Sequence, residues 1–192
     1  MNEINENTAV DYGPLTLLIG DWQGDKGLDV APEPGGREEN PYFESLSFSA
    51  IGNAVNAGTQ KLAVLRYHQV VSRKVDGEIF HDETGYWMWD ASNATVMHSL
   101  AIPRAVCVLA GGPWATQEDA GDRVSLLVAA KLDDPDWGIV QSPFMRDHAR
   151  TLEFRHEIVV ERDRLTYREM TLLDIYGKTF EHTDANELTK VQ

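Results

Sequence analysis

The sequence predicts an all-β protein, an antiparallel up-and-down β-barrel preceded by a short helical turn. Apolar and polar residues alternate with period two along most of the chain, turn-forming sequences separate these runs, and no long amphipathic helix is evident. A succession of strands with short turns favours a barrel or a sandwich, and closure into a barrel removes exposed strand edges. The 192 residues suit one domain with a sizeable core. We expect this domain over residues 14–192, after a flexible lead-in of residues 1–13.

The first element is expected to be one helical turn over Pro14–Ile19, with the proline near its start. The sequence Gly20-Asp-Trp22-Gln-Gly24 follows it. Gly20 allows a sharp turn, and Trp22 can bury a large area by plugging the floor of a barrel. A glycine two residues before a tryptophan resembles the first strand of calycin barrels, the lipocalin and fatty-acid-binding architecture.

Alternation predicts the strands that come next. Residues 31–41 are rich in Pro and Gly and indicate a turn-rich loop. Residues 133–150 are too many for a plain hairpin loop, so we expect an excursion at one barrel end with a helical turn. Residues 183–191 show no sustained apolar period. The strand-like runs are Tyr42–Ile51, Lys61–Arg73, Glu78–Asp90, Thr95–Ala110, Val124–Leu132, Arg150–Arg162 and Arg164–Tyr176.

The charge balance excludes several classes of partner. The chain has 17 Lys and Arg against 31 Asp and Glu, a formal net charge of −14. Phosphate backbones and anionic membranes both require clustered basic residues, so we expect neither nucleic acid nor a membrane as partner. The first residues have no basic or apolar region of a secretory signal, which favours a cytoplasmic protein.

Cys107 is the only cysteine of the chain. It rules out an internal disulfide, a Cys-rich zinc site and covalent Cys-x-x-Cys-His haem attachment. Because it lies between Val106 and Val108, we expect an inert, buried thiol.

The run Glu78–Asp90 is unusual in composition. Its residues Ile79, His81, Glu83, Gly85, Trp87 and Trp89 share one face. A packed core should not contain His and Glu beside two Trp, whereas a ligand cavity with a few polar contacts can. The alternative, in which these charges face solvent, stays open. His68, His81 and His98 on three successive strands could form a zinc site, but three unrelated histidines are the better interpretation.

Short motifs spread over most of the chain resemble the nitrobindin family. They are Pro14-Leu-x-x-Leu-Ile-Gly20-Asp-Trp22-Gln-Gly24, Tyr42-Phe-Glu44-Ser-Leu-Ser-Phe48, Ile51-Gly52-Asn53, Phe80-His81-Asp-Glu83-Thr-Gly85-Tyr86, Leu165-Thr-Tyr167 and His182-x-x-Ala185. The resemblance implies a barrel of about ten strands that binds haem b, with His182 as the iron ligand and His81 in the pocket. Glu83, Trp22 and Arg104 complete the expected cofactor-binding set. The implied chemistry is NO binding and isomerisation of peroxynitrite to nitrate, and a homodimer is plausible.

This chain departs from the family pattern at three places. The family's first strand commonly reads Gly-x-Trp-x-Gly-x-Gly, but here the third glycine is displaced to Gly27. Ala101-Ile-Pro-Arg104 replaces a small Ser/Thr-Gly pair, and the 133–150 excursion is longer than a plain hairpin. Arg104 and the excursion could therefore partly fill the pocket.

Two other functions remain open. The barrel could carry a fatty acid or another small apolar ligand, with Arg66, Arg104 or His81 meeting a carboxylate. It could instead be a structural or interaction protein with a packed, ligand-free barrel, which a large apolar cavity would reject.

Overall fold

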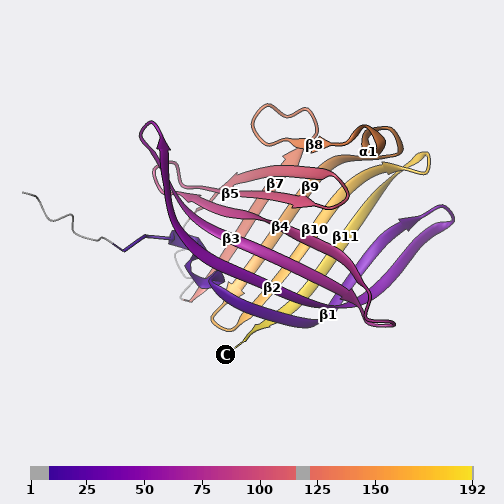
Figure 1. Ribbon diagram of the computed structural model, residues 1–192, viewed down its shortest axis with the longest axis horizontal. Helices are drawn as coiled ribbons and strands as arrows, with labels where there is room; N and C mark the ends of the chain where they lie inside the picture. The colour runs from indigo at the N-terminus through magenta and orange to yellow at the C-terminus, as the bar shows by residue number, and fades with distance from the viewer. Residues whose placement is uncertain (1–8, 116–121, 192) are drawn as a thin grey trace, which may run out of the picture.

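A computed structural model describes residues 9–115 and 122–191, and these residues form a closed antiparallel β-barrel (Figure 1). Ten strands follow one another around the barrel, and pairing between β5 and β6 completes the ring. An eleventh strand, β8, pairs only with β6. The predicted all-β barrel with an N-terminal helical turn is confirmed. The predicted lead-in, residues 1–13, lies in part outside the described residues.

The elements follow the chain in a simple order. They are η1 (Gly13–Leu18), β1 (Gly20–Glu33), β2 (Gly36–Ala57), β3 (Gln60–Arg73), β4 (Ile79–Asp90), β5 (Thr95–Ile102), β6 (Val106–Pro113), β7 (Arg123–Lys131), β8 (Ile139–Gln141), α1 (Pro143–His148), β9 (Ala149–Glu161), β10 (Arg164–Ile175) and β11 (Lys178–Lys190).

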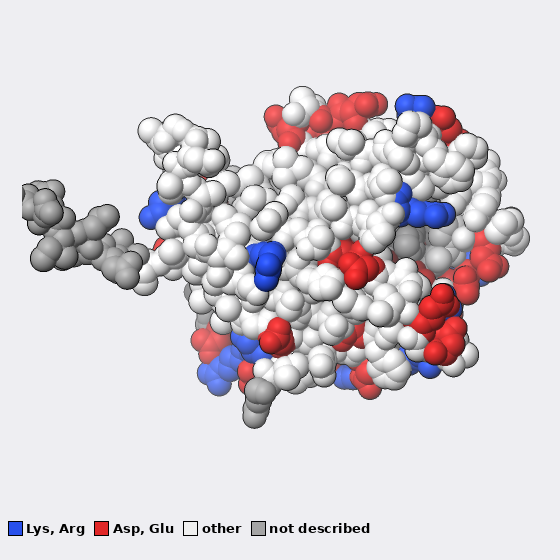
Figure 2. Space-filling view, in the orientation of Figure 1, with Lys and Arg blue, Asp and Glu red and all other residues white. Residues whose placement is uncertain are grey.

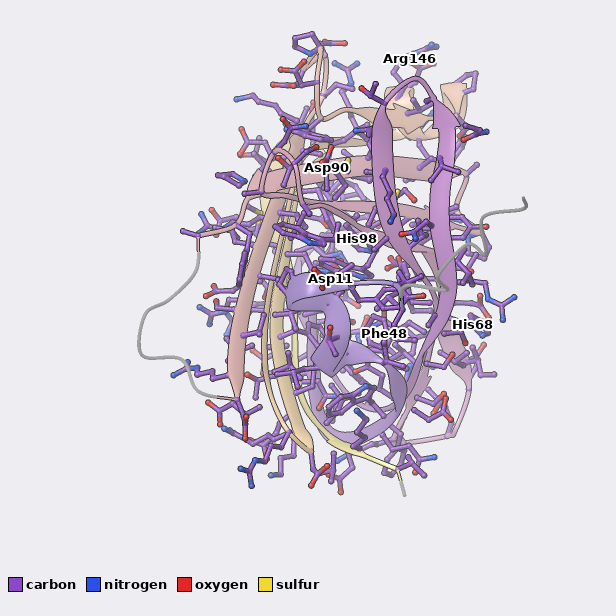
Figure 3. The ribbon with its side chains drawn as sticks, turned by 90° about the vertical axis from the view of Figure 1, so that its left-hand side faces the viewer. Asp11, Phe48, His68, Asp90, His98 and Arg146 are labelled. Atoms are coloured by element: carbon purple, nitrogen blue, oxygen red, sulfur yellow. The ribbon has the colours of Figure 1, made fainter. Side chains whose placement is uncertain are left out.

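The 3-10 helix η1 closes one end of the barrel, as Figure 3 shows from that side. Two of its own residues, Leu15 and Leu18, are fully buried. Trp22 is also fully buried, and its indole Nε1 donates a hydrogen bond to the carbonyl oxygen of Leu18 at 2.7 Å. The prediction that Trp22 plugs the barrel floor is therefore confirmed.

A β-bulge in β1 explains the displaced glycine. The register of β1 against both neighbouring strands shifts after Gly24, between Gly24 and Gly27 on one side and between Gly24 and Leu28 on the other. The extra residue in a bulge changes which residues face inward. Gly27 consequently packs on Tyr42, whose ring would overlap a β-carbon at that position.

The predicted loop over residues 31–41 is wrong. These residues form a two-stranded ribbon with a tight turn at Pro34 and Gly35, which extends beyond the barrel wall (Figure 1). Residues 31–33 pair only with residues 36–38, because the pairing of β1 with β11 ends at Val30 and that of β2 with β3 begins at Tyr42. Both strands of the ribbon therefore have an outer edge without a partner strand among the described residues. Proline is tolerated on such edges because it need not donate to a ladder, which is why this proline-rich segment can still be extended.

Three other predictions need correction. The run Thr95–Ala110 is two strands, β5 and β6, separated by a turn in which Ala105 has a positive φ of 60°. The C-terminal segment without apolar periodicity is β11, which pairs with β1 and β10. Cys107 is exposed rather than buried, because Val106 and Val108 take the inward positions on either side of it.

The predicted excursion at a barrel end is confirmed. It contains β8 and the short helix α1, in which the side chain of Ser142 accepts a hydrogen bond from the backbone N–H of Met145. Met145 is buried against the barrel core. The excursion thereby covers part of the end opposite η1 (Figure 1).

Figure 2 shows a face that is mostly uncharged, with acidic groups along its upper edge and toward its lower right and one acidic group near its centre. No helix within the described residues is long and apolar enough to cross a membrane.

Candidate functional site

A cavity of about 330 Å³ lies inside the barrel at the end away from η1. Its lining includes Met145 of α1 and residues next to the β1–β2 and β10–β11 turns, which lie together at that end in Figure 1. The apolar wall consists of Ala31, Pro32, Val71, Phe80, Leu100, Ile102, Val106, Val108, Met145, Ala149, Phe154, Leu173 and Ile175. The polar wall consists of Asp29, Gln69, His81, Glu83, Arg104, Thr151, Tyr167, Glu169, Thr171, His182 and Asp184.

His182 is held on the polar wall by two aspartates. Its Nε2 lies 2.6 Å from Oδ1 of Asp29 and 3.4 Å from Oδ2 of Asp184. The second oxygen of Asp29 accepts a hydrogen bond from Asn40 at 3.0 Å. Burial opposes protonation of His182, but the hydrogen bond to Asp29 and the charge of Asp184 outweigh it and raise the pKa of the imidazole.

The two aspartates face each other directly across β1 and β11. Like charges opposite one another in a sheet are destabilising. Burial, reinforced by the charge of Asp29, raises the pKa of Asp184 to about 6, although the neighbouring imidazoles of His182 and His81 lower it. One ligand atom each from Asp29, His182 and Asp184 lies within 4.8 Å of the others, which is a spacing compatible with a small metal ion.

His81 and Glu83 enter the cavity from β4. Glu83 is only 2% exposed, and its Oε1 accepts a hydrogen bond from the hydroxyl of Tyr67 at 2.6 Å. The other oxygen of Glu83 lies 3.6 Å from His81 Nε2, an ion-pair contact longer than a hydrogen bond. Burial opposes protonation of His81, but the adjacent Glu83 carboxylate raises the pKa of this imidazole overall.

A second carboxyl group, Glu44, is buried behind the polar wall. It accepts hydrogen bonds from Gln69, Tyr167 and Asn186 at 2.7–3.0 Å. Burial raises the pKa of Glu44 to about 7 despite these three donors, each of which lowers it. Since Gln69 and Tyr167 also line the cavity, this network fixes part of its polar surface.

Glu169 lines the cavity from β10, next to the buried His156. His156 Nδ1 lies 3.2 Å from an oxygen of Glu169, but the pair lacks hydrogen-bond geometry, and neither ring nitrogen of His156 has a hydrogen-bond partner among the described residues. Burial lowers the pKa of His156 to about 4 and raises the pKa of Glu169 well above its usual value, with help from the charge of Glu83.

The structure brings four of the five predicted site residues together. His182, His81, Glu83 and Arg104 all line the cavity, whereas Trp22 lies in the floor beneath η1 and does not.

The other basic and histidine candidates lie elsewhere. Arg66 and His68 are exposed, the latter beside Asp82 on the outside of the barrel. His98 is fully buried and stacks on Trp87 with ring centroids 4.2 Å apart. Figure 3 shows His68 at the outer side and His98 within the barrel. These histidines therefore form no joint metal site.

Asp29, Asp184 and Glu169 line the cavity but were not predicted from the sequence. Asp184 could have been found, because it lies two residues after His182 and so shares its face on a strand. Asp29 could not, since only the bulge turns it inward.

A family model matches residues 11–190, which include every described strand of the barrel, and its description is "THAP4-like, heme-binding beta-barrel domain". The chain belongs to this THAP4-like family of haem-binding β-barrels. The predicted resemblance to haem-binding barrels is thereby confirmed. No protein matched in a search of curated sequences.

The fold of this THAP4-like barrel is also seen in a solved structure, Rv2717c from M. tuberculosis. The two chains share 21% sequence identity, the match covers 95% of this chain and 100% of the other, and the TM-score is 0.69. At this identity the likeness extends to the fold alone.

Proposed function

We propose that the cavity binds haem b non-covalently, with His182 as the iron ligand, and that the protein performs NO or peroxynitrite chemistry. The observation that carries this proposal is an imidazole on the polar wall of a largely apolar cavity, in a barrel of the THAP4-like haem-binding family. A porphyrin needs apolar surroundings together with an axial donor, and His is a common one.

The residues that line the cavity are chemically suited to haem. Thirteen apolar residues of the described part of the chain line the cavity, and Arg104 supplies a cation suited to a carboxylate of a porphyrin side chain. Nε2 of His182 is already bonded to Asp29. The ring can therefore offer its Nδ1 while Asp29 is retained, or offer Nε2 once Asp29 moves away.

When bound, haem supplies a ferric centre that can bind NO and convert peroxynitrite into nitrate. The protein's own residues prepare the surroundings. Asp29 fixes the orientation of the His182 ring, a role that commonly tunes a metal-bound imidazole. His81 is favoured in its protonated form by Glu83, so it can donate a hydrogen bond to an anion in the cavity.

Titration of the purified protein with haemin tests this proposal. We expect a Soret band that saturates at one haem per chain and that is lost in His182→Ala. His68→Ala is the matched control, because His68 lies outside the barrel and its loss should leave the band unchanged. A saturating band of equal intensity in His182→Ala would reject His182 as the iron ligand, and absence of any band in the wild type would reject haem binding.

The alternative of a fatty-acid carrier has less support. Arg66 is exposed and does not reach the cavity, and Arg104 is accompanied there by four carboxyl groups, Asp29, Glu83, Glu169 and Asp184. The packed, ligand-free barrel is also disfavoured, because 330 Å³ falls within the usual range of ligand pockets, about 300–1,000 Å³.

A further inference from the structure

We infer that Glu44 and Tyr167 conduct protons through the wall of the barrel, between a groove on its outer surface and the cavity. The inference goes beyond the proposed function and does not depend on haem binding. It follows from the position of the groove, the bulge in β1 and the hydrogen bonds of Glu44.

The groove has a volume of about 640 Å³ and lies against β1–β4 and β11. Among the described residues, none lines both the groove and the cavity. Side chains alternate between the two faces of a strand, and on β3 Gln69 and Val71 line the cavity whereas Val70 and Ser72 line the groove. The groove therefore lies on the outside of the barrel, directly behind the wall of the cavity.

Glu44 is a buried acid that nevertheless lines the groove. Its neighbours Phe43 and Ser45 are exposed on the outer face, whereas Glu44 is only 4% exposed. Gly24, which is paired with Glu44 in the sheet, also lines the groove. A β-carbon at Gly24 would lie 2.8 Å from Nδ2 of Asn186, the amide that donates to Glu44 at 2.7 Å. Because Gly24 has no side chain, the hydrogen bonds of Glu44 lie directly behind the backbone that forms the groove.

The bulge in β1 interrupts the pairing of the wall beside Glu44. The register of β1 against β11 shifts between Gly24 and Leu28, and Asp25 and Lys26, which lie between these paired residues, line the groove. A bulge leaves its extra residue without ladder hydrogen bonds, so the backbone groups there bind water or side chains instead. Water can therefore stand in the groove next to Glu44. Other polar side chains of the groove are those of Gln23, Ser45, Ser72, Glu187 and Thr189.

Tyr167 connects Glu44 with the cavity. Its hydroxyl donates a hydrogen bond to Oε2 of Glu44 at 3.0 Å, and the residue lines the cavity. A hydroxyl group both donates and accepts hydrogen bonds, so Tyr167 can accept the proton of a protonated Glu44 while it passes its own proton to an acceptor in the cavity. One proton then enters the cavity and no tyrosinate forms. The ionised Glu44 takes a new proton from a hydronium ion in the groove, which becomes water.

The carboxyl group of Glu44 is suited to this transfer. Burial raises its pKa to about 7, although the hydrogen bonds from Asn186, Tyr167 and Gln69 lower it. A group whose pKa lies near the ambient pH both takes up and releases protons readily. Glu44 can therefore pass protons in either direction at neutral pH.

Exchange of tyrosine hydroxyl protons for deuterium in haem-free protein tests the inference. NMR follows each tyrosine through the isotope effect of its hydroxyl on the ring carbon Cζ. Because the hydroxyl of Tyr167 donates to Glu44, we expect Glu44→Gln to slow its exchange at least about tenfold. Ser45→Trp fills the groove beside Glu44 and should slow the exchange to a similar extent. Ser47→Trp is the matched control, since Ser47 lies on the same strand but does not line the groove.

Tyr67 serves as the reference within the same molecule. It is also buried, but its hydroxyl donates to Glu83 instead of Glu44. Its exchange rate should therefore stay unchanged in all three variants, which separates a blocked groove from a general change in the opening of the barrel.

Two results would overturn the inference. One is an exchange rate of Tyr167 that Glu44→Gln leaves unchanged, and the other is equal exchange of Tyr167 in Ser45→Trp and Ser47→Trp. The test is independent of the proposed function, because Ser45 does not line the cavity and Ser45→Trp should respond to haemin as the wild type does. Circular dichroism of each variant establishes that the barrel is still folded.

Discussion

The imidazole Nε2 of His182 lies 2.6 Å from Oδ1 of Asp29, and this contact joins the inner faces of β11 and β1. Asp29 is 4% exposed, and its second oxygen is fixed by Asn40. The contact therefore links the first strand of the barrel to the last at the wall of the cavity, where Asp29 also faces Asp184.

This contact should contribute measurably to stability. In a double-mutant cycle with Asp29→Asn and His182→Gln, followed by urea unfolding of haem-free protein, we expect a coupling energy of about 1–3 kcal/mol. The control cycle uses the exposed pair of His68 and Asp82, 3.2 Å apart, for which coupling should stay below about 1 kcal/mol. Equal coupling in the two cycles would contradict the structural role assigned to the buried contact.

Gly27 should not tolerate a side chain. A β-carbon there would overlap the ring of Tyr42. This tyrosine is fully buried, and its hydroxyl lies 2.7 Å from the hydroxyl of Tyr167. We expect Gly27→Ala to lower the free energy of unfolding by at least about 2 kcal/mol. Gly35→Ala, in a turn with nothing within 4 Å, is the control and should have little effect. Equal melting temperatures for the two variants would contradict the overlap.

The barrel could be predicted from the sequence because its core strands alternate regularly, as in β2, where Tyr42, Leu46 and Phe48 face inward. The strand β11 could not be predicted, because its inward residues His182, Asp184 and Asn186 line or support a polar wall and leave no apolar period. The polar side chains that β11 contributes to the cavity wall therefore interrupt the apolar alternation by which a strand is recognised.

The position of Asp29 was hidden for a different reason. Counting every second residue from Trp22 places Asp29 on the outer face, but the bulge after Gly24 reverses the alternation. The sequence showed that Gly27 departs from the glycine spacing of the family's first strand. It did not show that Asp29 faces inward, because that depends on the backbone geometry of the bulge, which periodicity does not reveal.

Trp22 should be the most important side chain of the barrel floor. Trp22→Phe removes the hydrogen bond to the Leu18 carbonyl and leaves a small void, so we expect a loss of about 2–4 kcal/mol of unfolding free energy. Trp114→Phe is the control, since Trp114 is only partly buried and packs edge-on against Trp89. Both variants are measured by urea unfolding. An equal loss of unfolding free energy in the two would show that the contact of Trp22 with Leu18 contributes no more to stability than the packing of Trp114.

Glu44 should make the stability of the protein depend on pH. Burial raises the pKa of Glu44 to about 7 from its ordinary value of 4.5, so between these values the folded state retains a proton that the unfolded state has released. The stabilisation from this proton is fully present below pH 4.5 and is lost as pH rises to 7.

Because other buried acids and His156 also titrate, the measurement compares wild type with Glu44→Gln rather than following one curve. We expect the wild type to lose about 3 kcal/mol relative to Glu44→Gln between pH 4.5 and pH 7.5, whereas a Glu157→Gln control follows the wild type. A difference between wild type and Glu44→Gln that stays constant across this range would show that Glu44 is ionised in the folded protein throughout, stabilised by Gln69, Tyr167 and Asn186.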